Sequence, residues 1–186
     1  MTEPLPKGDE PSDLELIERW QGGDERAATE LVARHAPALA RFAASAGATG
    51  GADVEELVQD TFVRAFASLD TFRGDSSLRT WLFTIERRLL LDRRRAGRRK
   101  PADVELQEGH AMTAHDALDT VVADESRQRL RLAVERLSPT QREVFTLRVG
   151  EGLSYREIAE AVGTTEGAAR VHYHNAMRTI KEFLND

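Results

Sequence analysis

Apolar residues recur along the chain with the three- and four-residue spacing of amphipathic helices, and no segment alternates like a strand. The clearest stripe, in residues 53–69, consists of Val54, Leu57, Val58, Thr61, Phe62, Ala65, Phe66 and Leu69. A second stripe consists of Leu78, Trp81, Leu82, Ile85 and Leu89. Together with helices predicted at 12–21 and 25–46, the latter with a kink at Pro37, they predict a four-helix domain over residues 12–96.

Capping signals predict where several helices begin. Residues 12–15 and 154–157 have the form S-x-x-E, and Ser138-Pro139-Thr140-Gln141 adds proline at the first helical position. We therefore predict helices at 139–149, 154–162 and 166–184, with Gly163-Thr164-Thr165 as the turn between the last two and Thr165 as a cap. Such a turn is typical of a helix-turn-helix unit, which we place in residues 125–186.

Residues 97–124 lack this periodicity and are acidic after a basic start. We interpret them as a flexible linker with a helical turn near 114–122, and residues 1–11 as a disordered N-terminus. The predicted fold is therefore all-α, with two small helical domains joined by a linker.

Charge is distributed unevenly along the chain, although the net value is only -6. Residues 1–63 carry -8, residues 64–100 carry +7, residues 101–126 carry -7 and residues 127–186 carry +2. The alternation indicates an acidic surface for a protein partner and basic surfaces for a polyanion, although ordinary solvated faces would give the same pattern. The chain has no cysteine, which excludes disulfides, and no signal-peptide-like or membrane-spanning apolar run, so we expect a cytoplasmic protein.

The last predicted helix carries a candidate surface for reading duplex DNA. One of its faces presents Arg170, Val171, His174, Asn175 and Arg178. In the major groove arginine pairs with guanine and asparagine with adenine, while a valine methyl group contacts thymine. Tyr155 and Arg156, at the start of the preceding helix, are placed to bind phosphates. The alternative is a solvated face on a helix that only packs.

The first domain combines aromatic and cationic residues that suit unpaired bases. They are Phe72, Trp81, Phe83, Arg73, Arg79, Arg87, Arg88 and residues 93–95. Stacking on an aromatic ring contributes ~1 to 3 kcal/mol per base. Because Trp81 lies on the apolar stripe, we interpret it first as a core residue, and we favour Phe72, in a loop, for contact with bases.

The helix at 53–69 has an acidic solvent side. Glu55, Glu56, Gln59 and Asp60 form a patch beside an exposed Val63. Such a patch suits a basic protein partner better than DNA, although by itself it is also typical of a solvated face.

Three segments resemble the signatures of extracytoplasmic-function sigma factors. Residues 52–62, ADVEELVQDTF, resemble the D-x-E-D-L-V-Q-E-x-F signature, and residues 72–82, FRGDSSLRTWL, resemble the F-x-G-x-S-x-x-T-W-L segment that follows it. Residues 137–159 are similar to the family's fourth region. The resemblance covers residues 12–96 and 125–184 in family order.

The resemblance implies a subunit that directs transcription initiation. Its acidic patch would dock on the clamp helices of the RNA polymerase β′ subunit, through Asp53, Glu56, Gln59 and Asp60. The unpaired -10 strand would lie around Phe72, Arg73, Asp75, Ser76, Trp81, Arg87 and Arg88. The -35 duplex would contact Tyr155, Arg156, Arg170, Val171, His174, Asn175 and Arg178. The resemblance also implies contact with the β flap and control by an anti-sigma partner.

Departures from the family fall where promoter specificity is expected. Arg88 replaces a common Asn, Arg94 replaces an apolar residue, and Ala168-Ala169-Arg170 stands where Thr-Val-Lys is frequent. The promoter sequence therefore does not follow from the resemblance.

The linker length adds an expectation about the free chain. Its 28 residues span at most ~90 Å when extended but average ~30 Å as a coil. We therefore expect polymerase to hold the domains apart, and the free chain to be compact and to bind DNA weakly.

Two other classes of protein compete with this interpretation. A helix-turn-helix regulator that binds an operator without polymerase would leave the arginine helix and the Phe72 loop unexplained. A helical interaction protein would explain the acidic faces but not the reading helix. An enzyme is least favoured, because the chain shows no nucleophile-base pair or phosphate loop, and we expect no cofactor. We expect no metal site either, since His172 and His174 point apart on a helix.

Overall fold

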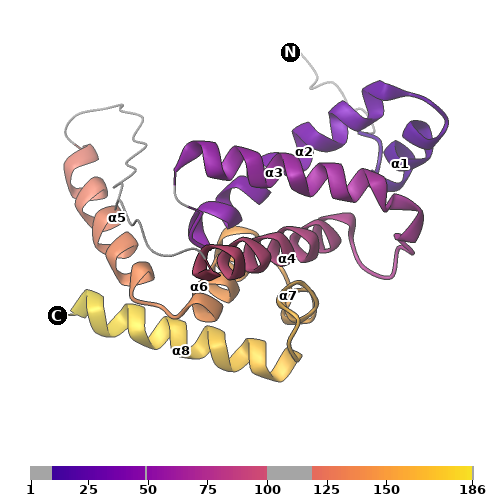
Figure 1. Cartoon of the computed structure of the whole chain (residues 1–186). Helices are drawn as coiled ribbons and strands as arrows, with labels where there is room; N and C mark the ends of the chain where they lie inside the picture. Colours follow the sequence, from indigo (N-terminus) through magenta and orange to yellow (C-terminus); the bar gives the residue numbers. More distant parts are fainter. Residues whose placement is uncertain (1–9, 49, 100–118, 186) are drawn as a thin grey trace, which may run out of the picture. The chain divides into compact units, whose positions relative to one another are not determined.

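The computed structural model describes residues 10–48, 50–99 and 119–185, and all regular structure within these ranges is helical (Figure 1). The predicted all-α class is therefore confirmed. The chain divides into two compact units, residues 1–37 and 38–186. No helix in the described ranges is long and apolar enough to cross a membrane.

The first unit contains α1 (Asp13–Gln21) and the first part of α2 (Glu25–Ser45). The predicted capping box is present, since Ser12 accepts from the Glu15 amide and the Glu15 carboxylate accepts from the Ser12 amide. Helix α2 includes Pro37, and the kink expected there stays a prediction. The division between the two units falls at this proline.

An ion-pair cluster joins the two helices of the first unit. Arg34 donates to one Asp13 carboxylate oxygen at 2.8 Å, and His35 Nε2 lies 3.0 Å from the other. Burial by itself would raise the pKa of the Asp13 carboxyl, but the interactions with His35 and Arg34 outweigh burial and lower that pKa. The carboxylate therefore stays charged and holds α1 on α2.

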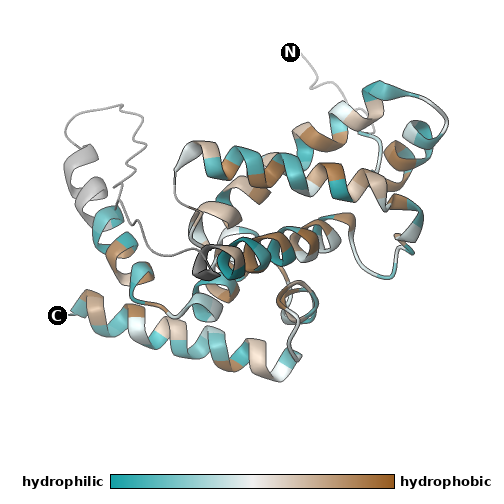
Figure 2. Ribbon diagram, viewed as in Figure 1, coloured by the Kyte–Doolittle hydropathy of each residue, from teal (hydrophilic) through white to brown (hydrophobic). Residues whose placement is uncertain are grey.

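The second unit begins with the end of α2, followed by α3 (Gly51–Ala67), the short η1 (Leu69–Thr71) and α4 (Leu78–Arg99). Helices α3 and α4 pack on each other, and their apolar residues form the predicted stripes (Figures 1 and 2). The stripes are buried at Leu57, Val58, Thr61, Phe62, Ala65, Leu78, Leu82 and Leu89. Phe42 of α2 meets Phe83 of α4 edge to face at 5.3 Å.

The rest of the second unit is α5 (Asp119–Glu135), α6 (Pro139–Phe145), the π-helical η2 (Thr146–Gly150), α7 (Tyr155–Val162) and α8 (Glu166–Asn185). Helix α8 packs on α5, α6 and α7. One buried cluster of this part consists of Ala133, Leu137, Ala176 and Ile180. These elements correspond to the helices predicted for the C-terminal segment.

Three boundaries differ from the predictions. Helix α4 extends to Arg99, beyond the expected end at 96, and α5 begins at Asp119 rather than near 124. Residues 100–118, most of the expected linker, and residues 1–9 of the expected disordered N-terminus lie outside the described residues. The helix predicted at 139–149 changes to a π turn after Phe145, where the Glu151 amide donates to the Thr146 carbonyl at 3.2 Å.

The capping box of α7 supports a stability prediction. The Ser154 hydroxyl accepts from the Glu157 amide at 3.3 Å, and the Glu157 carboxylate accepts from the Ser154 amide at 2.8 Å. Ser154→Ala removes the cap, so we expect a loss of about 1 kcal/mol in the free energy of unfolding, measured by urea titration. The control is Ser68→Ala, whose hydroxyl donates to the Arg64 carbonyl instead of capping an amide. Equal losses in both variants would contradict this role of Ser154.

Candidate nucleic-acid interface

Helices α7 and α8 are joined by the predicted short turn. Gly163 ends α7 in the left-handed conformation, with φ of 64°, which a residue with a Cβ adopts only with strain. Thr165 then caps α8 by accepting from the Ala168 amide at 3.1 Å. The side of α8 that packs inward presents Ala169, Ala176 and Ile180, all buried. The opposite side of α8 faces away from this core.

The predicted reading residues lie on that opposite side. The side chains of Arg170 and Arg178 are 61% and 64% exposed, and Val171 is 58% exposed. His174 is exposed and Asn175 is partly buried. A helix with exposed donors and a methyl-bearing residue on one face has the chemistry needed to read base edges. Their contact with -35 bases stays a prediction.

Tyr155 contacts arginine side chains on both of its neighbouring elements. Its ring centroid lies 4.8 Å from the guanidinium carbon of Arg148 and 4.9 Å from that of Arg170. The ring also meets Tyr173 of α8 at 5.9 Å, edge to face. Tyr155 therefore orients Arg170 at the start of the reading face, and Glu166 fixes the same guanidinium from the preceding turn at 2.5 Å. Arg156, by contrast, is exposed.

The segment predicted to meet the unpaired strand lies between η1 and the start of α4. Phe72 packs on Trp81, with ring centroids 5.2 Å apart, and both residues are only partly buried. Arg73 and Asp75 are exposed and Ser76 is partly exposed. Trp81 is therefore not a fully buried core residue, and its position against Phe72 leaves an aromatic pair at the surface. Further along α4, Arg88 is exposed.

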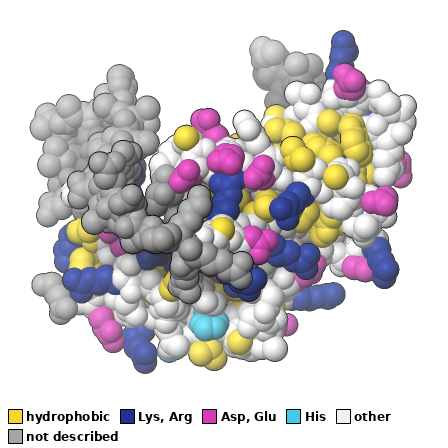
Figure 3. All heavy atoms as spheres, viewed as in Figure 1, with side chains coloured by type: hydrophobic (Ala, Val, Ile, Leu, Met, Phe, Trp, Pro, Cys, Tyr) yellow, Lys and Arg dark blue, Asp and Glu magenta, His cyan; other side chains and the backbone are white. Residues whose placement is uncertain are grey.

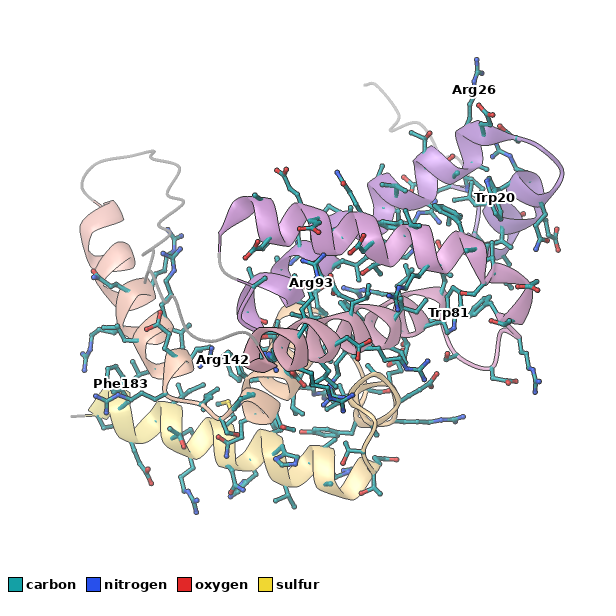
Figure 4. All side chains as sticks on the ribbon, in the orientation of Figure 1. Trp20, Arg26, Trp81, Arg93, Arg142 and Phe183 are labelled. Atoms are coloured by element: carbon teal, nitrogen blue, oxygen red, sulfur yellow. The ribbon has the colours of Figure 1, made fainter. Side chains whose placement is uncertain are left out.

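The acidic patch on α3 is held by a basic residue that sequence reasoning did not connect with it. Glu55, Glu56 and Gln59 are exposed, and Val63 beside them is 68% exposed. Arg93 reaches from α4 towards α3 and binds Asp60 at 2.7 Å and Glu56 at 3.3 Å (Figure 4). Its guanidinium also donates to the Asp53 carbonyl at 3.5 Å. The patch is therefore oriented and partly neutralised by its own fold.

Two buried carboxylates that sequence reasoning missed bind the arginines of α2 and α4. Glu151 accepts from Arg41 at 2.8 and 3.0 Å and is also bound by Arg79. Glu143 accepts from Arg87 at 2.8 Å and lies 3.5 Å from Arg94. Figure 3 shows other basic and acidic side chains interspersed on the face that it draws. One signal in the sequence could have revealed one of these carboxylates. Glu143 lies next to Val144, at a position of its helix that faces the core.

A third buried carboxylate, Glu86 of α4, has no such partner. The residue is fully buried, and neither side-chain oxygen has a hydrogen-bond partner in the described part of the chain. Burial raises the pKa of Glu86 to about 9, so the side chain is neutral at pH 7. Because it lies on the apolar side of α4 beside Leu82 and Leu90, it contributes to the core and not to the charged surface.

The absence of a metal site stays an expectation for this chain, and one observation on the described ranges bears on it. No group of three or more His, Cys, Asp or Glu residues there could hold a metal ion. His172 is partly buried and His174 is exposed on α8.

Comparisons with known proteins point to one family. Residues 31–100 match the family described as Sigma-70 region 2, and residues 127–180 match Sigma-70, region 4. The chain is 34% identical over 178 residues to the ECF RNA polymerase sigma-E factors of Escherichia coli (strain K12) and Salmonella typhimurium (strain LT2), covering 91% of this chain and 92% of each relative. It is 33% identical over 178 residues to the ECF RNA polymerase sigma factor BldN of Streptomyces coelicolor, covering 93% of this chain and 66% of the relative.

Two solved structures agree with these matches. The structure of CnrH in complex with the cytosolic domain of CnrY has a TM-score of 0.69 at 29% identity, over 94% of this chain and 98% of that one. The sigma factor RpoE in complex with the anti-sigma factor NepR from Bartonella quintana also gives 0.69, at 30% identity over 84% and 96%.

Proposed function

The chain belongs to the extracytoplasmic-function (ECF) family of RNA polymerase sigma factors, and from this premise we propose that it binds core RNA polymerase, recognises the -10 and -35 promoter elements and directs transcription initiation. It acts as a non-enzymatic subunit, in the cytoplasm where polymerase and DNA are. Region 2 (residues 31–100) provides the polymerase and -10 surfaces, and region 4 (residues 127–180) provides the -35 surface.

The observation that carries the proposal is the geometry of α7 and α8. A capped helix, a three-residue turn with a left-handed glycine and a second helix with an exposed polar face follow one another in region 4. Such a unit places its second helix in the major groove. Arg170, Val171, His174, Asn175 and Arg178 are the proposed -35 contacts on that helix, and Tyr155 and Arg156 support them from α7.

Region 2 supports the other two roles. The patch of Asp53, Glu56, Gln59 and Asp60, beside exposed Val63, suits a basic surface such as the proposed β′ clamp helices. The pair of Phe72 and Trp81 suits unstacked bases, and the neighbouring cations suit phosphates. The proposed -10 contacts are Phe72, Arg73, Asp75, Ser76, Trp81, Arg87 and Arg88. The β flap is the proposed polymerase contact of region 4.

An anti-sigma partner is part of the same proposal. CnrH and the RpoE of Bartonella quintana, to which this chain is similar in fold, were each solved in a complex, with the cytosolic domain of CnrY and with the anti-sigma factor NepR. A partner chain that covers the proposed polymerase-binding or promoter-binding surfaces of this protein would prevent transcription initiation.

The test is specific transcript initiation by purified bacterial core polymerase, with and without this protein, on a pooled library of genomic promoter fragments. Initiation at a shared two-part motif is the expected result. If core polymerase is neither bound nor redirected, the proposal fails, and an operator-binding regulator built on the same helix-turn-helix unit becomes the better explanation.

The -35 assignment makes a separate prediction. Arg170→Ala and Asn175→Ala should each weaken binding of the holoenzyme to the identified promoter by about 5- to 150-fold, since a good base contact contributes ~1 to 3 kcal/mol of discrimination. The measurement is electrophoretic mobility shift with the promoter and with each of its single-base -35 variants. The control is Lys181→Ala, later on α8. If each substitution weakens binding equally on all -35 variants, the two residues contact the DNA backbone and do not read bases.

A further inference from the structure

Regions 2 and 4 are joined by ion pairs to two buried carboxylates. The side chains of Glu143 and Glu151 in region 4 are only 2% and 1% exposed. Each is bound by two arginines of region 2, Glu151 by Arg41 and Arg79, and Glu143 by Arg87 and Arg94. Glu151 directly follows the π turn, and its carboxylate binds arginines of both α2 and α4.

The surrounding contacts place α7 and its turn against the same side of α4. The Thr80 hydroxyl donates to the Glu157 carboxylate at 3.5 Å. A Cβ atom added at Gly163 would lie 3.8 Å from a terminal nitrogen of Arg87. The helix-turn-helix unit therefore packs on the arginine side of α4, as the contacts between α4 and α7 also show.

The chemistry of this interface is that of oxyanion recognition. A guanidinium binds a carboxylate and a phosphate with the same fork of donors. Four arginines carry two more charges than the two carboxylates they bind, so the region 2 side keeps an excess of positive charge. Arg41 binds Glu151 through two nitrogens, and this hydrogen bonding raises the pKa of Arg41 further above its ordinary value.

The spacing of the arginines also suits a nucleic-acid backbone. Arg79, Arg87 and Arg94 lie on one side of α4, and fifteen residues of helix extend ~22 Å. That length corresponds to about six base steps of 3.4 Å along one strand. Arg87 already belongs to the proposed -10 contacts, whereas Arg41, Arg79 and Arg94 do not.

We infer that Arg41, Arg79, Arg87 and Arg94 form one phosphate-binding surface of region 2, and that Glu143 and Glu151 occupy this surface in the free chain as substitutes for phosphates. The inference rests on the proposed function and extends it. In the free chain region 4 covers the surface and DNA is excluded. When polymerase separates the regions, the arginines exchange carboxylates for promoter phosphates.

The experiment compares two double variants of the full chain. Glu143→Gln with Glu151→Gln removes both charges at nearly constant volume. Glu135→Gln with Glu160→Gln makes the same change of net charge at two exposed positions of region 4. The probe is a fluorescein-labelled single strand of 20 nucleotides, titrated by anisotropy at several salt concentrations. Because the chain has no cysteine, Asp92→Cys and Glu182→Cys, both exposed, provide a labelled pair for energy transfer between the regions.

The expected result is about tenfold tighter binding by the Glu143/Glu151 variant at 0.1 M salt, a steeper salt dependence and lower transfer efficiency, with little change in the control. In that variant, adding Arg41→Gln or Arg79→Gln should reduce the binding again. If the two double variants bind alike, or if the arginine substitutions have no effect, the inference is overturned. Transcription by wild-type protein and core polymerase would in that case leave the proposed function standing.

A second measurement tests the inference if the Glu143/Glu151 variant does not fold. If circular dichroism shows that the Glu143/Glu151 variant has lost helix, the comparison is repeated with Arg41→Gln in the otherwise unchanged chain, since that side chain is 58% exposed. Lower transfer efficiency is expected. Unchanged efficiency would overturn the inference.

Discussion

Replacing Gln59 and Asp60 together by lysine should abolish specific initiation by core polymerase. The helix-turn-helix unit of region 4 should stay folded, since neither residue belongs to it. Both residues belong to the α3 patch, and the change adds three positive charges where the proposed partner surface is basic. Like charges brought together at an interface cost several kcal/mol, so we expect at least a hundredfold loss of affinity for core polymerase. Fluorescence titration of labelled protein with core polymerase measures it.

The control for this variant has to match its charge and composition. Glu18→Lys with Gln21→Lys changes one carboxylate and one amide on exposed positions of α1. Asp60 also binds Arg93, so its replacement disturbs a contact within region 2. Gln59→Lys alone, which preserves that pair, should still weaken polymerase binding about tenfold. If Gln59→Lys binds as well as the α1 variant, the patch is not the polymerase contact.

Replacing Glu86 by methionine should stabilise the protein, and increasingly so as pH rises. In the folded chain the pKa of Glu86 is about 9, whereas the ordinary value is 4.5. The folded state therefore retains a proton that the unfolded state loses, and wild-type stability falls between about pH 4.5 and pH 9, by at most about 1.4 kcal/mol per pH unit. Methionine fills a similar volume without a titrating group, so its advantage should be small at pH 5 and a few kcal/mol at pH 8.

Urea titrations at pH 5, 6.5 and 8 test this prediction, with Glu86→Gln as the control. Glutamine cannot ionise but brings an amide into an apolar site, so it should remove the pH dependence without stabilising the protein at pH 5. Parallel pH profiles for wild type and Glu86→Met would mean that Glu86 has a charged partner in solution.

Local signals in the sequence predicted the helices well, but they could not predict contacts between residues far apart in the chain. Ser12, Ser138 and Ser154 mark their helix starts because a capping box involves residues three apart. The bonds from Arg41 to Glu151 join residues 110 positions apart, and no periodicity connects such a pair. Glu86 shows the same limit, since no local pattern marks an isolated carboxylate among arginines as a buried residue.

The candidate sites divide in the same way. The exposed face of α8 was predictable because apolar periodicity identifies its inward side and leaves the rest for a ligand. The position of Tyr155 between Arg148 and Arg170 was not predictable, because it depends on how α7 packs against its neighbouring elements. Trp81 was predicted first as a core residue, and it packs at the edge of the core, where Phe72 covers it.

The π turn at residues 146–150 also affects how this protein can evolve. A π turn contains one residue more than an α-helical turn, so the loss of a single codon there would let α6 continue in ordinary register. Because only the extra residue of the π turn is lost, Glu151 would still face Arg41 and Arg79, and every residue of α7 and α8 would be retained. Natural variation can therefore remove one codon at the π turn and keep these ion pairs, whereas the loss of one codon within α6 itself would turn Glu151 by about 100° away from the two arginines.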